Sequence, residues 1–459
     1  MLEKGIAAEV LNRAVSTGGD FAEIFLEDRN DHQLQIRSGK LETVNSLRLH
    51  GAGVRVFTGT NAIYVYTNDT SLSGLLTCAG KAADAIKAGA GCTPVPLKLN
   101  ETVNVHPIFQ RPDQVKASRK AQILRNVEKA ARQDPRIVQV VAGYSDSCQR
   151  VWIANTDGLL TGDTRVYTRV IITAIASDGK ENQTGYEAPG AMMGFEIFNT
   201  MIDPEKIGAN AAAIALLNLE ADLCPAGVMP VIIDNGFGGV IFHEACGHSL
   251  EATSVAFGAS EFTGKIGQVI AAKCVTAIDD GTIPNEWGSI NIDDEGMPTG
   301  KLTLIKDGVL ENFMIDKLGG LRMNMPPTGS SRRQSYAFAP TSRMRNTYIA
   351  AGPDKEEEMI RTIGDGLYAK RMGGGSVNPA TGEFNFAVLE GYLIKDGKID
   401  KPVRGASLIG RGSEILQRID RVGGNMQMSQ GMCGSMSGSV PTNVGQPMIR
   451  VTGMTVGGQ

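Results

Sequence analysis

The chain has 459 residues, too many for one ordinary hydrophobic core, so two or three domains are expected. Its 45 basic and 49 acidic residues give a net charge of −4, and no basic cluster resembles a surface that follows a phosphate backbone, so direct nucleic-acid binding has no support. The longest apolar stretches, such as 211–217, are too short to cross a bilayer, and the N-terminus lacks signal-peptide features. Seven widely spaced cysteines form no disulfide pattern, which favours a cytoplasmic protein.

The first half of the chain combines helices with strands. Apolar residues at helical spacing predict helices over 1–18, 69–88, 113–133 and 203–223. Apolar or alternating runs predict strands over 21–26, 34–37, 47–57, 62–67, 137–144, 150–155, 164–176 and 182–187. The polar residues 28–31 predict a turn. Because Cys224-Pro225-Ala226-Gly227 stops the last helix, we place a domain boundary there, with an N-terminal α+β domain over 1–224.

The second half, 225–459, has many turns and little helical periodicity. Strands are predicted over 275–279, 302–306, 309–313 and 389–395, and Asp307-Gly308 and Asp396-Gly397 predict hairpin turns. A helix is predicted over 353–369, and the glycine-rich residues 372–376 predict flexible backbone. The fold class expected is therefore α+β, with an N-terminal α/β sandwich-like domain and a mostly β C-terminal domain that carries the helix described next.

One six-residue stretch, His243 to His248, carries the clearest chemistry. A hydrophobic strand at 228–233 and a glycine-rich turn at 235–239 lead into a helix predicted from about 239 to 251. Only five histidines occur in the chain, and two of them flank this short window with Glu244 directly after the first. Two imidazoles that bind a metal ion, with a carboxylate beside a metal-activated water, are what a zinc hydrolase needs.

The spacing of the two histidines departs from the common H-E-x-x-H pattern, in which they are four residues apart. Five residues turn an ideal helix through about 500°, which leaves the two rings about 140° out of phase. A shared ion therefore requires either a π-bulge or a helix that unwinds at Gly247. The metal interpretation thus predicts a widened or broken helix.

A catalytic zinc site usually has three protein ligands, and no further histidine lies downstream. Cys433, in a glycine-flanked segment, is the best candidate for the third ligand, because a thiolate is a good zinc donor. The residues alone leave open that Cys433 is a plain buried thiol. Cys246, between the histidines, is the rival ligand, although a side chain packed against the sheet is the simpler interpretation.

Several stretches together resemble the TldD/PmbA family of metallopeptidases, on the zinc-bearing TldD side. They are 243–248, Arg343-Met344-Arg345-Asn346-Thr347-Tyr348, 381–397, Met432-Cys433-Gly434 and 441–447. The resemblance covers nearly the whole chain and implies a two-domain α+β zinc-dependent peptidase. It also implies His243, His248 and Cys433 as zinc ligands and Glu244 as general base.

The resemblance further implies a peptide or unfolded protein as substrate, and either a PmbA-type paralogous subunit or a second copy of the chain as partner. The family is linked to maturation of peptide antibiotics and degradation of small unfolded proteins, and older names call it a modulator of DNA gyrase. Arg343, Arg345 and Tyr392 are candidates to bind substrate and polarise its carbonyl. The alternative is a non-catalytic regulatory or binding protein with a structural zinc site, in which Cys246 is a fourth ligand.

Overall fold

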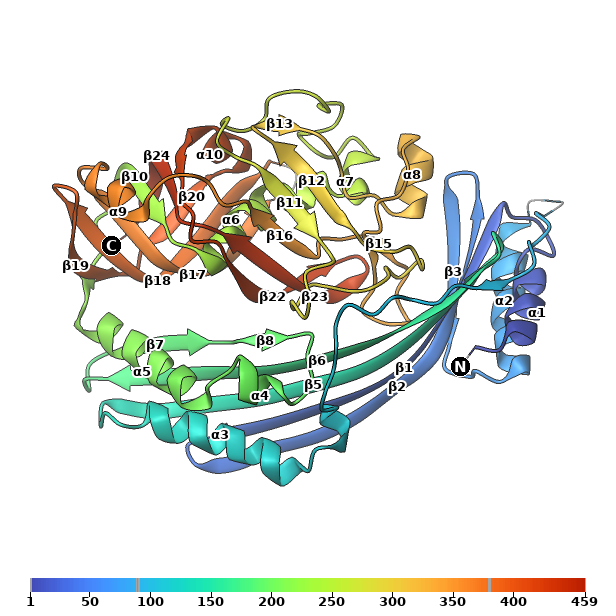
Figure 1. Ribbon diagram of the computed structural model, residues 1–459, viewed down its shortest axis with the longest axis horizontal. Coiled ribbons are helices and arrows are strands. Elements are labelled where there is room, and N and C mark those ends of the chain that lie inside the picture. Colours follow the sequence, from blue (N-terminus) through green and yellow to red (C-terminus); the bar gives the residue numbers. More distant parts are fainter. Residues whose placement is uncertain (1, 88, 90, 379–380, 459) are drawn as a thin grey trace.

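The computed structural model of the chain describes residues 2–87, 89, 91–378 and 381–458. Its fold is mixed α+β, as the sequence predicts. Long strands from the first half form one curved sheet, and the second half lies over it (Figure 1). Met1 and Ala88, the first residue of one predicted helix and the last residue of another, lie outside the described residues.

The N-terminal sheet is antiparallel at its centre, with the strand order β3-β2-β1-β5-β6-β4, and β7 and β8 also pair with β6. Its strands are β1 Phe21–Arg37, β2 Lys40–Thr58, β3 Asn61–Thr67, β4 Lys98–Leu99, β5 Ile137–Asn155, β6 Leu159–Ser177, β7 Asn182–Glu187 and β8 Gly190–Ala191. The helices of this half are α1 Lys4–Ala14, α2 Leu72–Ile86, the short 3-10 helix η1 Pro112–Gln114, α3 Ala117–Ala131, α4 Ile197–Thr200 and α5 Pro204–Glu220. Ser71 caps α2, because its side-chain oxygen accepts a hydrogen bond from the Gly74 amide.

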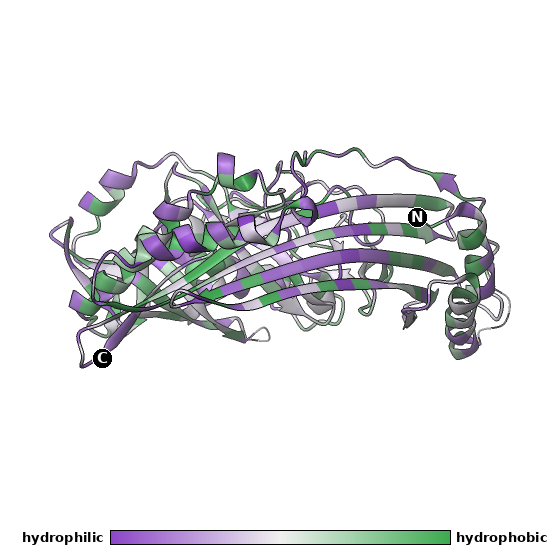
Figure 2. Cartoon of the chain, turned by 90° about the horizontal axis from the view of Figure 1, so that it is seen from below, coloured by the Kyte–Doolittle hydropathy of each residue, from purple (hydrophilic) through white to green (hydrophobic). Residues whose placement is uncertain are grey.

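Two separate hydrophobic cores stabilise the two ends of this long sheet. At one end α1 and α2 pack on residues such as Ile24 and Val54, and at the other α3 and α5 pack on residues such as Val140 and Ile172. Figure 2 shows hydrophobic residues at the strand ends beside α1 and α2 and a larger share of hydrophilic residues along the middle. The middle of the sheet is thus left to polar contacts.

The turn predicted at 28–31 is wrong, because β1 continues through it. Each residue there pairs with β2 on one side and with β5 on the other. The two strands predicted over 137–144 and 150–155 are likewise one strand, β5. Alternate polar side chains of these strands face the C-terminal half: Arg29 donates to the Gln334 carbonyl, Glu27 accepts from the Tyr336 amide, and Arg165 pairs with Asp294.

The C-terminal half contains two larger sheets, with strand orders β17-β10-β24-β20-β18-β19-β9 and β13-β12-β11-β16-β23-β22, and the small pair β14-β15; β21 also pairs with β24. Its strands are β9 Asp222–Leu223, β10 Gly227–Ile233, β11 Ala277–Asp280, β12 Lys301–Lys306, β13 Val309–Leu310, β14 Ser331–Arg332, β15 Thr341–Ser342, β16 Asn346–Ile349, β17 Gly366–Asn378, β18 Glu383–Lys395, β19 Lys398–Arg404, β20 Ser407–Arg411, β21 Ile419–Val422, β22 Gln427–Ser435, β23 Gly438–Gln446 and β24 Ile449–Gly457. Its helical segments are η2 Gly236–Gly239, α6 Val240–Phe242, η3 His243–Gly247, η4 His248–Leu250, α7 Ala252–Val255, α8 Lys317–Met323, α9 Glu356–Arg361 and α10 Gly412–Arg418.

Both predicted hairpin turns are confirmed, with Asp307 and Asp396 in the left-handed region at φ 48° and 49°. The helix predicted over 353–369 is too long, because α9 ends at Arg361 and β17 begins at Gly366, where it pairs with β10 and β18. The residues 372–376 are not a flexible loop but lie in β17, where bulges interrupt the register with β18. Pairing on both sides of β17 overrides the local helical pattern.

Among the described residues, no helix is long and apolar enough to cross a membrane. The domain boundary at 224–225 stays a prediction. Near it, α5 packs on the N-terminal sheet and β9 pairs with β19 of the C-terminal half.

Candidate metal centre

A π-helical segment begins at His243 and ends just before His248, which is the widening that the spacing of the two histidines predicts. Residues His243–Gly247 form the π-helical segment between α6 and the 3-10 turn that starts at His248. A π-helix has more residues per turn than an α-helix, so residues five apart return to the same face. The imidazole centroids are accordingly 5.2 Å apart, with their planes at 82°.

Gly247 serves this segment through close packing rather than through unusual backbone angles. Its φ is −55°, an ordinary helical value, so the helix does not unwind there. A Cβ at this position would lie 2.2 Å from the sulfur of Met344, which packs against the π-helix. On the preceding turn, a Cβ at Gly239 would meet the Gly445 backbone at 2.6 Å. The segment is therefore fitted closely against β23 and the strand that follows Met344.

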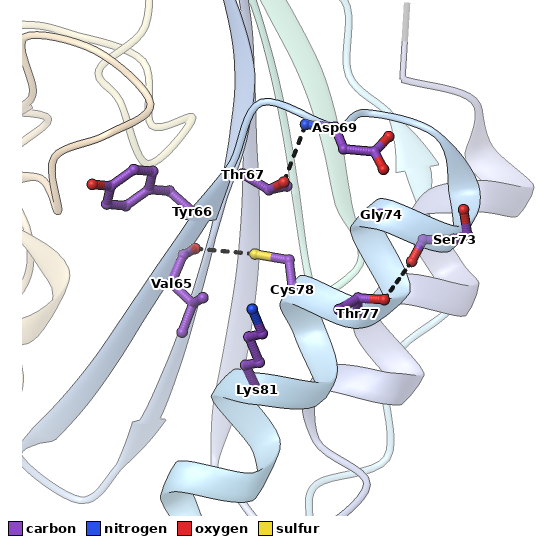
Figure 3. Close-up of a pocket in the computed structure, with 9 residues that line it drawn as sticks. All are labelled: Val65, Tyr66, Thr67, Asp69, Ser73, Gly74, Thr77, Cys78 and Lys81. Atoms are coloured by element: carbon purple, nitrogen blue, oxygen red, sulfur yellow. Dashed lines mark hydrogen bonds between the residues drawn. The ribbon is translucent and has the colours of Figure 1, made fainter.

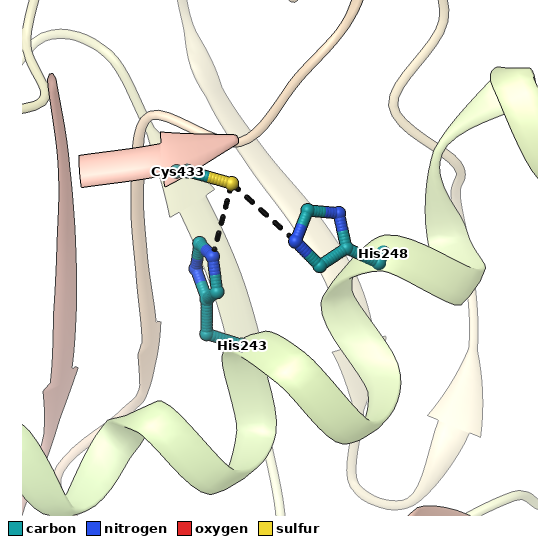
Figure 4. A group of neighbouring side chains, drawn as sticks. All are labelled: His243, His248 and Cys433. Carbon is teal, nitrogen blue, oxygen red and sulfur yellow. Dashed lines mark hydrogen bonds between the residues drawn. The ribbon is translucent and has the colours of Figure 1, made fainter. Parts of the chain in front are cut away.

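The third potential ligand atom is a sulfur from a segment near the C-terminus. The β22–β23 hairpin brings Cys433 over the π-helix, with its Sγ 3.3 Å from His243 Nε2 and 3.4 Å from His248 Nε2 (Figure 4). The potential ligand atoms of these three residues lie within 4.8 Å of one another. Among the described residues, these three form the one group of three or more His, Cys, Asp or Glu side chains whose ligand atoms lie that close together.

The three donors fit a zinc ion. With Zn–N distances of about 2.0–2.1 Å and a Zn–S distance of about 2.3 Å, tetrahedral geometry places nitrogen and sulfur donors about 3.6 Å apart. The two nitrogen–sulfur distances of 3.3 and 3.4 Å are close to that value. Two imidazoles and one thiolate are also a donor set that zinc prefers.

Two glutamates flank the donors in different ways. Glu251 is buried and its Oε2 lies 3.1 Å from His248 Nδ1, so it orients the ring that points its other nitrogen at Cys433. Glu244 lies on the opposite side, with Oε2 3.7 Å from His248 Nε2 and a side chain that is 32% exposed. Glu251 was not singled out from the sequence, although its position three residues after His248 matches the helical spacing of interacting pairs.

The electrostatics of the cluster favour a charged thiolate beside the imidazoles. Burial alone would raise the pKa of Cys433, but the positive charge and hydrogen bonds of the two histidines hold that pKa well below its ordinary value. Burial lowers the pKa of His248, yet the Glu251 carboxylate and Cys433 together raise it well above its ordinary value. A metal cation would take the place of the protons in this pairing.

The structure brings one of the three substrate-binding candidates to this hairpin. Arg343 is fully buried and donates to the Cys433 carbonyl, to Ser437 Oγ and to the Gly438 carbonyl, so it fixes the hairpin end. Arg345 instead pairs with buried Asp279 at 2.7 Å. Tyr392 lies on β18 and donates to Glu390.

Cys246 points into the hydrophobic core of the C-terminal half and is fully buried. It is not part of the group formed by the two histidines and Cys433. Burial raises the pKa of its thiol well above the ordinary value. These features match a packed core side chain.

A small cavity of about 220 Å³ lies far along the chain from these donors, between β3 and α2. Figure 3 shows its lining, where the Cys78 thiol donates to the Val65 carbonyl and Thr77 donates to the Ser73 carbonyl. None of His243, His248 and Cys433 lines it. This cavity is a separate feature of the N-terminal half.

Three family models match the chain: the PmbA/TldA metallopeptidase domain 1 at 22–86, the central domain at 110–219 and the C-terminal domain at 226–458. The Metalloprotease TldD homolog of Haemophilus influenzae is 35% identical over 448 residues, covering 96% of this chain and 93% of the relative. A metalloprotease of Methanothermobacter thermautotrophicus is 30% identical, covering 96% of each.

Solved structures share the fold. A Thermotoga maritima protein described as a modulator of a DNA gyrase superposes with a TM-score of 0.78 at 20% identity, covering 95% of this chain and 96% of that one. TldE from Thermococcus kodakarensis superposes with a TM-score of 0.75 at 17% identity, covering 98% and 99%. At these identities the likeness establishes the architecture.

Proposed function

The chain belongs to the PmbA/TldD metallopeptidase family, and from that premise we propose that it is a zinc-dependent peptidase. The relatives' metalloprotease names imply a metal ion. The observation that carries the proposal is the convergence of His243, His248 and Cys433, in which a sulfur from the C-terminal hairpin lies within 3.4 Å of two imidazole nitrogens.

These three side chains would hold the ion. A bound zinc ion supplies a Lewis acid for the scissile carbonyl and lowers the pKa of a water that it holds. Three protein donors leave one position of a tetrahedral ion for water or substrate, whereas a structural zinc site is closed by four. The absence of Cys246 from the described group supports the catalytic over the structural alternative.

Glu244 is the general base in this proposal. Its carboxylate lies beside His248 and stays partly exposed, so it can reach both the attacking water and the substrate. It accepts a proton from that water and then passes the proton to the leaving amine. Buried Glu251 cannot share this role, because it is held against His248 and accepts from the Met344 amide.

We propose extended or unfolded peptides as substrates. The strand that carries Cys433, β22, ends the strand order of its sheet and pairs on one side with β23. An extended peptide can add to such an edge through backbone hydrogen bonds. Recognition through the backbone favours unfolded chains with little selection among side chains.

The proposal includes a PmbA-type paralogous subunit or a second copy of this chain as partner, in the cytoplasm. The fold shared with TldE is compatible with pairing between similar chains. Purification of the tagged protein from its native host, followed by mass spectrometry and zinc analysis, identifies the partner subunit and the bound metal. Recovery of the chain as a monomer without a related subunit would contradict the partner proposal.

Glu244→Gln tests the central assignment. The variant should bind zinc as the unaltered protein does, yet hydrolyse an unfolded peptide about 10²–10⁴-fold more slowly, because the base is removed while the donors remain. Glu357→Gln, on the exposed face of α9, is the matched control. Equal hydrolysis by the Glu244→Gln variant and the control would overturn the assignment.

A further inference from the structure

A larger cavity, of about 390 Å³, lies between the N-terminal sheet and the β22–β23 hairpin. Its walls come from β1, β5 and β6 on one side, and from β14, Trp287 and the hairpin on the other. Five arginines but three aspartates line it, namely Arg29, Arg165, Arg169, Arg332 and Arg333 against Asp31, Asp146 and Asp294. The lining is therefore cationic in a chain whose net charge is −4.

Three of these arginines have carboxylate partners within the protein. Arg29 pairs with Asp31 at 3.1 Å, Arg165 with Asp294 at 2.7 Å, and Arg333 with Glu23 at 3.0 Å. Their charges are compensated where they stand. The remaining two arginines of the cavity differ from these three in their partners.

Arg169 and Arg332 have no carboxylate within 4.0 Å among the residues that the structure describes. Arg332 is 3% exposed and donates to a single acceptor, the Met344 carbonyl at 2.9 Å. Arg169 is 8% exposed and donates to the carbonyls of Ala188 and Gln430. Burial lowers the pKa of both, that of Arg332 to about 10.

A buried cation without a counter-ion is costly, so such groups are normally paired. Guanidinium groups form two parallel hydrogen bonds to a carboxylate, which makes them suited to bind that group. Aromatic rings lie beside Arg169: its guanidinium is 5.2 Å from the centre of the Trp287 ring, and Trp287 meets Tyr167 edge-on at 5.3 Å. The cavity thus offers two uncompensated cations and a flat apolar wall.

The cavity shares its wall with the metal centre. Met432 and its register partner Pro441 line it, and Cys433 directly follows Met432 in β22. Neighbouring side chains of a strand point to opposite faces, so Met432 faces the cavity while Cys433 faces the histidines. Met344, whose carbonyl accepts from Arg332, packs with its sulfur against Gly247 of the π-helix.

We propose that this cavity is a carboxylate-binding subsite for the substrate peptide, in which Arg169 and Arg332 hold an Asp or Glu side chain or the peptide's C-terminal carboxylate. The inference rests on the proposed function, since it assigns the ligand as part of a peptide.

The fluorescence of Trp287 reports whether a ligand occupies the cavity, and it does not require hydrolysis of the peptide. The chain has two tryptophans, and Trp152→Phe leaves Trp287 as the single emitter, against the cavity wall. Three pentapeptides of otherwise equal sequence are titrated: one with a central Glu and an amidated end, one with Gln and an amidated end, and one with Gln and a free C-terminal carboxylate. Succinate is titrated as a small free carboxylate.

At least one carboxylate-bearing peptide should bind about tenfold or more tightly than the uncharged peptide, because hydrogen bonds between charged groups are stronger than neutral ones. The peptide that binds more tightly shows whether the cavity takes the Glu side chain or the C-terminal carboxylate. Arg332→Gln and Arg169→Gln should each reduce this preference, and the double variant should abolish it. Arg361→Gln, an exposed arginine of α9, is the control and should keep it.

Equal binding of the three peptides to the Trp152→Phe protein would overturn the proposal, and this comparison does not depend on the folding of any arginine variant. Succinate that binds as tightly as the best peptide would also overturn it, since the cavity would then take a free anion. Peptide preference without any hydrolysis would contradict the proposed function and leave the subsite standing. Hydrolysis of peptides without a preference for a carboxylate would contradict the subsite and leave the proposed function standing.

Discussion

One face of the β22–β23 hairpin holds a sulfur 3.3 and 3.4 Å from two imidazoles, whereas its other face borders two buried arginines that lack a carboxylate partner among the described residues. On the first face the charges are matched within the protein: Cys433 against the histidines, and His248 against Glu251. On the second face Arg169 and Arg332 are left uncompensated. The alternation of side chains along one hairpin thus presents groups suited to a cation on one face and groups suited to an anion on the other.

The largest expected effect on zinc content and hydrolysis comes from removal of the Cys433 thiolate. Cys433→Ala should lose most of the bound zinc and all measurable hydrolysis, because two imidazoles alone hold the ion weakly. Cys246→Ala, which alters a core thiol outside the donor group, should keep its zinc. Zinc content by atomic emission and hydrolysis of an unfolded peptide measure both. Loss of zinc in the Cys246 variant but not in the Cys433 variant would reverse the assignment of the ligands.

A smaller change tests how the first face is oriented. Glu251→Gln keeps the shape of the side chain but removes the charge that fixes the His248 ring. Zinc affinity should fall by about 10–100-fold, as expected for a group that orients a ligand. Competition with a fluorescent chelator measures it, with Glu311→Gln, an exposed loop residue, as control. Unchanged affinity would mean that His248 is oriented without Glu251.

The packing behind the metal centre can be tested by Gly247→Ala. The added methyl group would lie 2.2 Å from the Met344 sulfur, so the variant should lose about 1–3 kcal/mol of unfolding free energy. Met344→Ala in the same chain should recover part of that loss, because the colliding atoms are removed. Gly5→Ala, at a helical position with nothing within 4 Å, should not destabilise the protein. Urea unfolding measures these three variants and Met344→Ala alone, and additive losses in the double variant would exclude the contact.

Asp316, a buried carboxylic acid of the C-terminal half, gives a pH-dependent test. Burial, and then the charge of Glu295, raise the pKa of Asp316 to about 7. An unfolded aspartate has a pKa of about 3.9, so between these values the folded state holds a proton that the unfolded state releases. The contribution of this group to the unfolding free energy therefore falls as the pH rises from about 4 to about 7.

Asp316→Asn should flatten that dependence, whereas Asp307→Asn, in an exposed hairpin turn, should not. Urea unfolding at several values between pH 4.5 and about 7.5 compares the slopes of the three proteins. Identical slopes for the Asp316 variant and the unaltered protein would show that this carboxyl titrates as an ordinary one.

The local chemistry could be predicted from the sequence because it is contained in one short segment. The five-position spacing of His243 and His248 required a widened or broken helix, and the π-helix follows from that spacing. Cys433 could not be chosen over a plain buried thiol from its neighbours alone, since its place beside the histidines depends on a hairpin 190 residues away. The resemblance to a family supplied what local pattern could not.

The errors have a common physical origin in contacts between distant parts of the chain. Residues 28–31 have the composition of a turn, but their polar side chains suit the middle of a sheet that faces another part of the protein. The segment 366–369 has helical periodicity, but two neighbouring strands pair with it. Arg169 and Arg332 carried no pattern in the sequence, because only folding sets them side by side with Trp287 and the hairpin.

The account depends on one ion held by three side chains. Anomalous diffraction at the zinc absorption edge, on crystals of the zinc-loaded protein, tests it most directly. We expect a single peak about 2.0–2.1 Å from the Nε2 atoms of His243 and His248 and about 2.3 Å from the Cys433 sulfur, with one position open beside Glu244. A peak elsewhere, or one closed by a fourth protein ligand, would contradict the account.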